Sequence, residues 1–137
     1  MKYFDETELV ASATAQARGI DNTPPAQAKK ALVRLVENVL DPLREAFGSP
    51  IYVNSGYRCA ALNALVGGAK SSQHMRGEAA DVTAGSRDAN MRLWRLLRKL
   101  DLPVDQAINE HNYSWIHISH SRTNRREFIV QKLTMTH

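Results

Sequence analysis

A long apolar stripe in the first third of the chain is the feature that most constrains its fold. From residue 26 onward, apolar residues recur at the three- and four-residue spacing of one helical face. The stripe consists of Ala28, Ala31, Leu32, Leu35, Val36, Val39, Leu40, Leu43 and Phe47. Gly48 and Pro50 end the pattern, and Pro42 lies inside it. The sequence therefore predicts a helix over 26–47 that kinks or restarts near Pro42.

The residues before this helix have the composition of a connecting segment. Residues 1–23 include many polar and small side chains, and the stretch "GIDNTPP" leads into the helix. Asn22 or Thr23 is placed to cap the helix, with Pro24 and Pro25 near its first turn. We therefore expect the N-cap at Asn22 or Thr23, and we assign no helix or strand before it.

After Gly48 the pattern changes to short segments separated by turns. The stretch "CAALNALVGG" predicts a short helix closed by glycine, and a second clear helix runs from about Arg87 to Leu100. Strands are predicted at 51–58, 78–84, 105–108, 115–119 and 128–132. Helices first, followed by strands that alternate with turns, indicate the α+β class.

Length and composition limit the classes of protein that fit. We assign all 137 residues to a single domain, 1–137, and find no apolar run of the ~18 residues that a membrane span needs. The N-terminus is acidic where a signal peptide would be apolar, so we expect synthesis in the cytoplasm without a signal peptide. Cys59 is the single cysteine, and we expect it at a small buried helical position rather than as a nucleophile.

The chain is basic, with a formal net charge of +4. Its basic residues cluster in "RLLRKL" and "SRTNRRE", and such a surface suits polyanions such as nucleic acid or bacterial wall polymers. No stripe of aromatic residues or nucleic-acid module accompanies these clusters. We therefore expect a solubilising surface, with no nucleic-acid or membrane partner and a monomeric protein.

Two histidines and one aspartate form a pattern that is typical of a metal site. His74 and Asp81 are too far apart to share one helical face, and their spacing fits a loop that enters a strand, with Gly77 in the bend. His117 lies on a predicted strand, on the same face as Trp115. Two imidazoles and one carboxylate are ligand types of catalytic zinc. Taken alone, the pattern also fits buried hydrogen-bonded histidines and an aspartate that caps a turn.

The motif around these residues is more specific than their spacing. Residues 72–81, "SQHMRGEAAD", have the form S-x-H-x-x-G-x-A-x-D, with "VNSGYRCAALNALVGGAKSSQH" overlapping upstream and "WIH" downstream. The chain closely resembles the zinc D-alanyl-D-alanine carboxypeptidase family of peptidoglycan peptidases over about residues 4–130. It is most similar to the small single-domain members of phages and prophages. The resemblance implies one zinc ion held by His74, Asp81 and His117.

The resemblance also implies a fold and two further site residues. The expected fold is that of lysostaphin-type peptidases and the Hedgehog signalling domain, a small antiparallel sheet that carries the metal and is flanked by helices. Arg58 in "SGYR" matches an arginine that reaches the substrate, and its alternative role is a structural salt bridge. Ser72 also matches the motif, and it either orients substrate and neighbouring groups or forms a turn.

The general base is where the sequence departs from many relatives. They carry an acidic residue three positions before the last zinc histidine, or a histidine two before it, whereas this chain has Ser114 and Trp115. Glu110 is the nearest acidic residue upstream, and the turn "HNYS" can bring it back toward the metal. We predict Glu110 as the base, with His111 in reserve. The alternative is that Glu110 is a solvated loop carboxylate.

These residues predict a zinc metallopeptidase that hydrolyses a peptide bond of the wall stem peptide or cross-link. The alternative is a catalytically inactive zinc-bearing module that binds wall peptides or a protein partner. Since the motif is similar to phage-type members, we expect action on the bacterial wall after release, in phage lysis or as part of a virion. The sequence leaves open which bond is cut.

Overall fold

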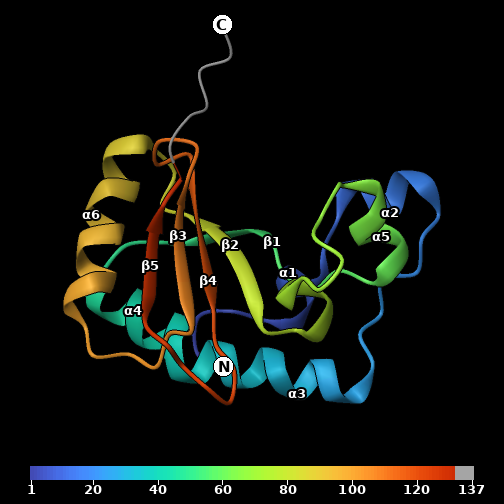
Figure 1. Cartoon of the computed structure of the whole chain (residues 1–137), viewed down its shortest axis with the longest axis horizontal. Helices are drawn as coiled ribbons and strands as arrows, with labels where there is room; N and C mark the ends of the chain where they lie inside the picture. Colours follow the sequence, from blue (N-terminus) through green and yellow to red (C-terminus); the bar gives the residue numbers. More distant parts are fainter. Residues whose placement is uncertain (132–137) are drawn as a thin grey trace, which may run out of the picture.

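Within residues 1–131, which the computed structural model describes, five strands form one sheet in the order β1–β2–β4–β3–β5 (Figure 1). The strands are β1 Tyr52–Ser55, β2 Ala79–Thr83, β3 Gln106–Glu110, β4 Trp115–Ser119 and β5 Glu127–Val130. Each strand overlaps one predicted from the sequence. Of the residues in these predicted strands, only Lys132, at the end of the last one, lies outside the described residues.

The pairing of β5 differs from the expected antiparallel sheet. The pairs β1–β2, β2–β4 and β3–β4 are antiparallel, but β5 runs parallel to β3. Strand β4 already has β2 on one edge and β3 on the other, so the returning chain pairs with the free edge of β3. Because β5 runs opposite to β4, it must then be parallel to β3. The α+β class is confirmed, with a mixed rather than purely antiparallel sheet.

The predicted helix over 26–47 is formed by three consecutive helical segments. These are α3 Ala26–Leu35, a π-helical turn η1 Val36–Leu40, and α4 Asp41–Phe47. The N–H of Asp41 donates to the carbonyl of Val36, five residues back. This wider turn comes immediately before Pro42, which has no N–H and would crowd an ordinary α-helical carbonyl ladder. The expected restart near Pro42 is therefore confirmed.

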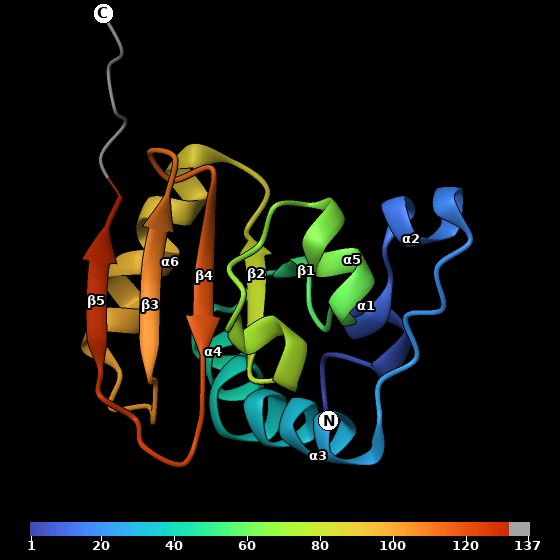
Figure 2. The ribbon, with the colours of Figure 1, turned by 45° about the vertical axis from the view of Figure 1, so that its right-hand side comes forward.

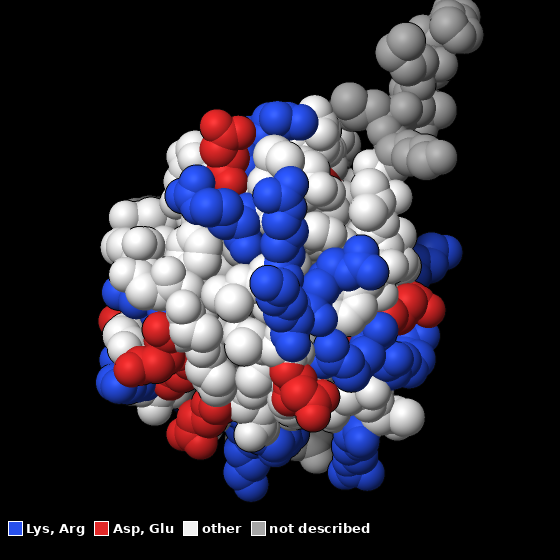
Figure 3. Space-filling view, turned by 90° about the vertical axis from the view of Figure 1, so that its left-hand side faces the viewer, with Lys and Arg blue, Asp and Glu red and all other residues white. Residues whose placement is uncertain are grey.

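Helices cover one face of the sheet and leave the other open. The helix α6, Arg87–Lys99, packs with α3, η1 and α4 against one sheet face, and Figure 2 looks onto the opposite face with α4 and α6 behind it. The core contains Leu35, Val39, Leu93, Leu97, Val82, Ile116 and Ile118, all fully buried. The outward face of α6 carries exposed cations, which Figure 3 shows as a stripe of Lys and Arg side chains.

Two short helices lie in the N-terminal segment, where the sequence predicted none. They are α1 Glu6–Val10 and α2 Ala13–Arg18, and each begins at a side-chain cap. Asp5 accepts the N–H of Glu8, and Ser12 accepts the N–H of Ala15. One or two turns are too short to produce a recognisable apolar period, which explains why these helices were missed.

Asn22 has a different role from the predicted helix cap. The N-cap of α3 is Pro25, without a side-chain hydrogen bond. The side-chain amide of Asn22 instead donates to the carbonyls of Val10 (2.9 Å) and Tyr57 (3.0 Å), and its oxygen accepts the N–H of Cys59 (2.8 Å). Asn22 thereby ties the N-terminal helices to the segment that follows β1.

The segment between β1 and β2 contains the short helix α5, Ala60–Leu65, and a 3₁₀ turn η2, Gln73–Arg76. Cys59 is the half-buried N-cap of α5, rather than a buried residue inside the helix. Gly67 has φ of +73°, a conformation that favours glycine, just beyond the end of α5. None of the helices within residues 1–131 has the length and apolarity to cross a membrane.

Candidate metal centre

The open face of the sheet carries the polar residues singled out in the sequence. In the β2–β4 ladder Asp81 is paired with His117, and in the β3–β4 ladder Glu110 is paired with Trp115. Alternation along each strand places these four side chains on one face, opposite the core residues Val82 and Ile116. The strand register therefore brings residues from three strands to one surface.

His74 reaches the same surface from the η2 turn. Its backbone N–H donates to Ser72 Oγ (3.2 Å), and its ring Nδ1 lies 2.7 Å from the carbonyl oxygen of Gly56. A carbonyl only accepts, so Nδ1 carries the proton and Nε2 is left to face Asp81. Ser72 is thus a turn-forming cap in the structure, which supports the second of its two predicted roles.

Gly77 returns the chain from η2 into β2. It has φ of +71°, and a Cβ at this position would overlap the backbone carbonyl of Ala28 in α3. Glycine is therefore required both by the backbone conformation and by the close approach of the helix. The loop that carries His74 rests directly on α3.

The three predicted ligands, His74, Asp81 and His117, converge on one point, and we refer to these three side chains as the metal cluster. Asp81 Oδ1 lies 3.3 Å from His74 Nε2 and 2.9 Å from His117 Nδ1, and the three donor atoms all lie within 4.8 Å of one another. Donor atoms bound at about 2.0–2.2 Å around one tetrahedral zinc ion lie roughly 3.3 Å apart. The side chains are at most 16% exposed. The donor types and their spacing fit a zinc ion with an open fourth position.

Asp81 is held in its charged form by these neighbours. Burial acts to raise its pKa, but the adjacent imidazoles of His117 and His74 outweigh burial and hold the pKa of Asp81 well below its ordinary value. A carboxylate that stays ionised is an available metal ligand across the physiological pH range.

Arg58 lies next to Asp81. Its Nη2 is 3.9 Å from Asp81 Oδ2, and its Nη1 donates to Asn63 Oδ1 (3.1 Å). Burial lowers the pKa of Arg58, and the charge of Asp81 opposes this shift. Within residues 1–131, Arg58 Nε is a buried atom without a hydrogen-bond partner. The structure thus contains the salt-bridge contact that the sequence offered as the alternative role of Arg58. Arg58 also lines a groove at the site, so its position fits the substrate-binding role as well.

Glu110 ends β3, diagonally across the ladder from His117. Burial raises its pKa, the nearby charge of Asp81 raises it further, and His117 and His111 act in the opposite direction. Glu110 is therefore a half-buried carboxylate in the field of the metal cluster, which disfavours its alternative assignment as a solvated loop residue.

An unusual turn holds Glu110 in this position. His111, Asn112 and Tyr113 have φ values of +46°, +55° and +64°, and none of them is glycine. Such residues are costly, so the turn needs compensating contacts. Asn109 Oδ1 accepts the N–H of Tyr113 (2.8 Å), and the Asn90 side chain donates to the Tyr113 carbonyl (2.9 Å).

The other two histidines within residues 1–131, His111 and His120, do not join the cluster. The ring of His111 packs on Trp115 with centroids 4.8 Å apart. His120 is buried on another side, with Nδ1 2.7 Å from the Pro103 carbonyl, as expected for a residue that is not a ligand. His137 lies outside the described residues.

Two grooves open onto the metal cluster. One, of about 430 Å³, lies between α2 and β1 and is lined by Arg58, Asp81 and Trp115. The other, of about 500 Å³, is lined by His117, Ser72, Arg76 and Glu78 among others. The two grooves are therefore lined by neighbouring members of the cluster, the cross-strand partners Asp81 and His117.

Asp105 stabilises the loop that carries His74, and the sequence did not identify it as a site residue. It accepts from Arg125 Nε (2.8 Å) and from the side-chain amide of Gln73 (3.1 Å), next to His74. Its position before β3 gave no signal, because the partners come from distant segments. Strand alternation correctly placed Trp115 on the same face of β4 as His117.

Comparison with known proteins identifies relatives of this chain. A model of the family described as peptidase M15 matches residues 2–119. A zinc D-Ala-D-Ala carboxypeptidase from Streptomyces albus G is 51% identical over 49 residues. The match covers 35% of this chain and only 19% of that protein.

Proposed function

The chain belongs to the peptidase M15 family of zinc metallopeptidases, and we propose that it hydrolyses a peptide bond in the stem or cross-link of bacterial peptidoglycan. The observation that carries this proposal is the convergence of His74, Asp81 and His117, with donor atoms within 4.8 Å of one another. The carboxypeptidase named above supports a wall peptide as the substrate class. Which bond is cut is left to experiment.

In this proposal His74 Nε2, Asp81 Oδ1 and His117 Nδ1 hold the zinc ion. When bound, zinc would polarise the scissile carbonyl and lower the pKa of a water molecule toward ~7. The hydrogen bond that His74 Nδ1 donates to the Gly56 carbonyl would keep the ring oriented with Nε2 toward the ion.

Glu110 acts as the general base and then as the acid. It takes a proton from the attacking water and delivers it to the leaving amine. Its raised pKa supports this role, because a carboxylate whose pKa is closer to neutral pH accepts and returns a proton more readily. His111 remains the reserve, although its ring is packed on Trp115.

Arg58 binds the substrate beside the metal. Its guanidinium contacts Asp81 and Asn63, and its Nε has no hydrogen-bond partner within residues 1–131, so donors remain free for a peptide carboxylate or carbonyl. Ser72 supports the site indirectly, by holding the backbone of His74.

We place the action of the protein on the wall after release, in phage lysis or as a virion component, because its motif is similar to phage-type members. The alternative function is a zinc-bearing module that binds wall peptides or a protein partner without cleaving them. Glu110 beside the cluster favours the enzyme.

The test is hydrolysis of purified peptidoglycan with mass spectrometry of the released peptides. We expect new amino and carboxyl termini at one type of bond, loss of cleavage with a chelator, and recovery on adding zinc. Binding of walls without any cleavage by the zinc-loaded protein would support the inactive module. Cleavage that is insensitive to the chelator would contradict both functions.

A further inference from the structure

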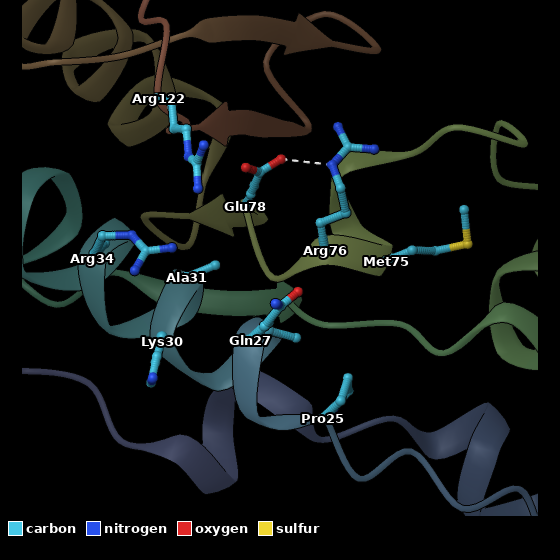
Figure 4. Close-up of a pocket in the computed structure, with 10 residues that line it drawn as sticks. Pro25, Gln27, Lys30, Ala31, Arg34, Met75, Arg76, Glu78 and Arg122 are labelled. Carbon is cyan, nitrogen blue, oxygen red and sulfur yellow. Dashed lines mark hydrogen bonds and ion pairs between the residues drawn. The ribbon is translucent and has the colours of Figure 1, made fainter.

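A basic groove lies beside the metal centre, between α3 and the loop that follows β4. It has a volume of about 470 Å³, and its charged lining residues are Lys30, Arg34, Arg76, Glu78 and Arg122. Figure 4 shows these residues on α3 (Lys30 and Arg34), at the end of η2 (Arg76), just before β2 (Glu78) and in the loop after β4 (Arg122). We refer to it as the α3 groove.

The charges in the α3 groove are not balanced. The carboxylate of Glu78 is already paired with Arg76, whose Nε lies 2.8 Å from Glu78 Oε1. Arg34 and Arg122 have no hydrogen bond or ion pair from their side chains to other residues within 1–131. Both point into the space beside Glu78 from different walls (Figure 4). Two guanidinium groups that share a groove repel each other, and an anion between them would relieve this repulsion.

The α3 groove lies next to the groove at the metal cluster, with which it shares two lining residues. Arg76 and Glu78 line both, and the second groove also contains His117. Arg34, Glu78 and Arg122 line a further hollow that runs past His120. Glu78 directly precedes β2 and is three residues before Asp81, which corresponds to about 10 Å of extended chain. A peptide bound at the cluster would therefore reach the α3 groove with roughly three extended residues.

We propose that Arg34 and Arg122 bind a free carboxylate of the substrate peptide, several residues from the bond that is cut. The proposal rests on the proposed function, which supplies a peptide at the metal cluster. Guanidinium groups bind planar carboxylates through paired hydrogen bonds. We assign a carboxylate rather than a phosphate to this groove, because the proposed substrate is a peptide, whose anionic groups are carboxylates. The α3 groove thus selects substrates that carry an acidic group at this distance.

The experiment compares two wall-derived peptides that differ only in whether this carboxylate is free or amidated. Wild type, Arg34→Gln, Arg122→Gln and the double variant are assayed on both. We expect the KM for the free-carboxylate peptide to rise about tenfold for each arginine, since a charge-assisted hydrogen bond is lost, with kcat unchanged. The KM for the amidated peptide should not change. Arg95→Gln on α6 removes the same charge from an exposed position and serves as the matched control.

Binding is also measured directly, by calorimetry on the Glu110→Gln protein, so that the result does not depend on cleavage. A preference for the free carboxylate that disappears in the double variant would support the inference even if no peptide were hydrolysed. Hydrolysis with equal KM for both peptides in the wild type would overturn the inference and leave the proposed function standing. Tighter binding of inorganic phosphate than of the acidic peptide would also overturn it.

Discussion

The two faces of β2 and β4 carry different kinds of side chain, although successive residues of the same strands supply both faces. On one face Val82, Ile116 and Ile118 are fully buried against the helices. On the other, Asp81 and His117 form the metal cluster with His74. The apolar face fixes where the strands lie, and the polar face uses this placement to bring ligands together. If this division is correct, substitutions on the two faces should affect different measurements.

The largest effect is expected on the open face, at the shared carboxylate. Asp81→Asn removes the charge that faces both histidines, so zinc affinity should fall by at least ~100-fold and peptidase activity should be lost. Metal content and wall hydrolysis measure this. The matched control is Asp88→Asn, an exposed residue in the first turn of α6, which should keep both. Full zinc binding by the Asp81 variant would contradict the ligand assignment.

The next effect separates catalysis from metal binding. Glu110→Gln should lower kcat by about 10²–10⁴-fold, because the isosteric amide cannot accept the proton. Zinc content should remain at one ion per chain, as in the control Glu37→Gln, an exposed position on η1. A Glu110 variant with unchanged kcat would transfer the role of the base to His111 or to another group.

The buried face should respond in stability rather than in chemistry. Ile116→Ala is expected to lower the free energy of unfolding by about 2–5 kcal/mol, because the side chain is fully buried. Zinc stoichiometry of the folded protein should not change. Val130→Ala, at a position that is 55% exposed, is the control and should have little effect in denaturant unfolding. Loss of zinc from folded Ile116→Ala protein would show that the faces are not independent.

A smaller, pH-dependent effect is expected at Asp105, which links the cluster to the end of the sheet. Hydrogen bonds from Arg125 lower the pKa of Asp105, and burial only partly opposes this. The ionised form is favoured in the folded state, so its stabilisation is present above the ordinary pKa of about 3.9 and is lost as pH falls below it. Asp105→Asn should lower the free energy of unfolding by about 1–3 kcal/mol at neutral pH. The variant should also lose less stability than the wild type as the pH falls. Unfolding measured between pH 7 and pH 3 tests this, with exposed Asp101→Asn as the control.

Features with a local sequence period were predictable. The apolar stripe of 26–47 gave the long helix, and alternation in 115–119 correctly placed Trp115 beside His117 on one face. The motif brought His74, Asp81 and His117 together before any geometry was known. The helix and the strand face are each encoded in a short stretch of residues, whereas the ligand set came from the resemblance of two separate segments, 72–81 and "WIH".

Features that depend on distant partners were not predictable. The parallel pairing of β5 follows from which sheet edge is free, which is a property of the whole sheet. Asn22 bonds to Val10 and, much further along the chain, to Tyr57 and Cys59, so its local position suggested only a helix cap. The turn after Glu110 uses three non-glycine residues at positive φ, which no turn signature indicates.

The contact between Gly77 and α3 has a consequence for thermodynamic linkage. Since the loop of His74 rests on the backbone of Ala28, docking this loop is part of both metal binding and helix packing. The apparent affinity for zinc then includes the free energy of seating the loop on the helix. A change that loosens α3 will therefore weaken metal binding without touching a ligand, and bound metal will in turn protect α3 against local opening.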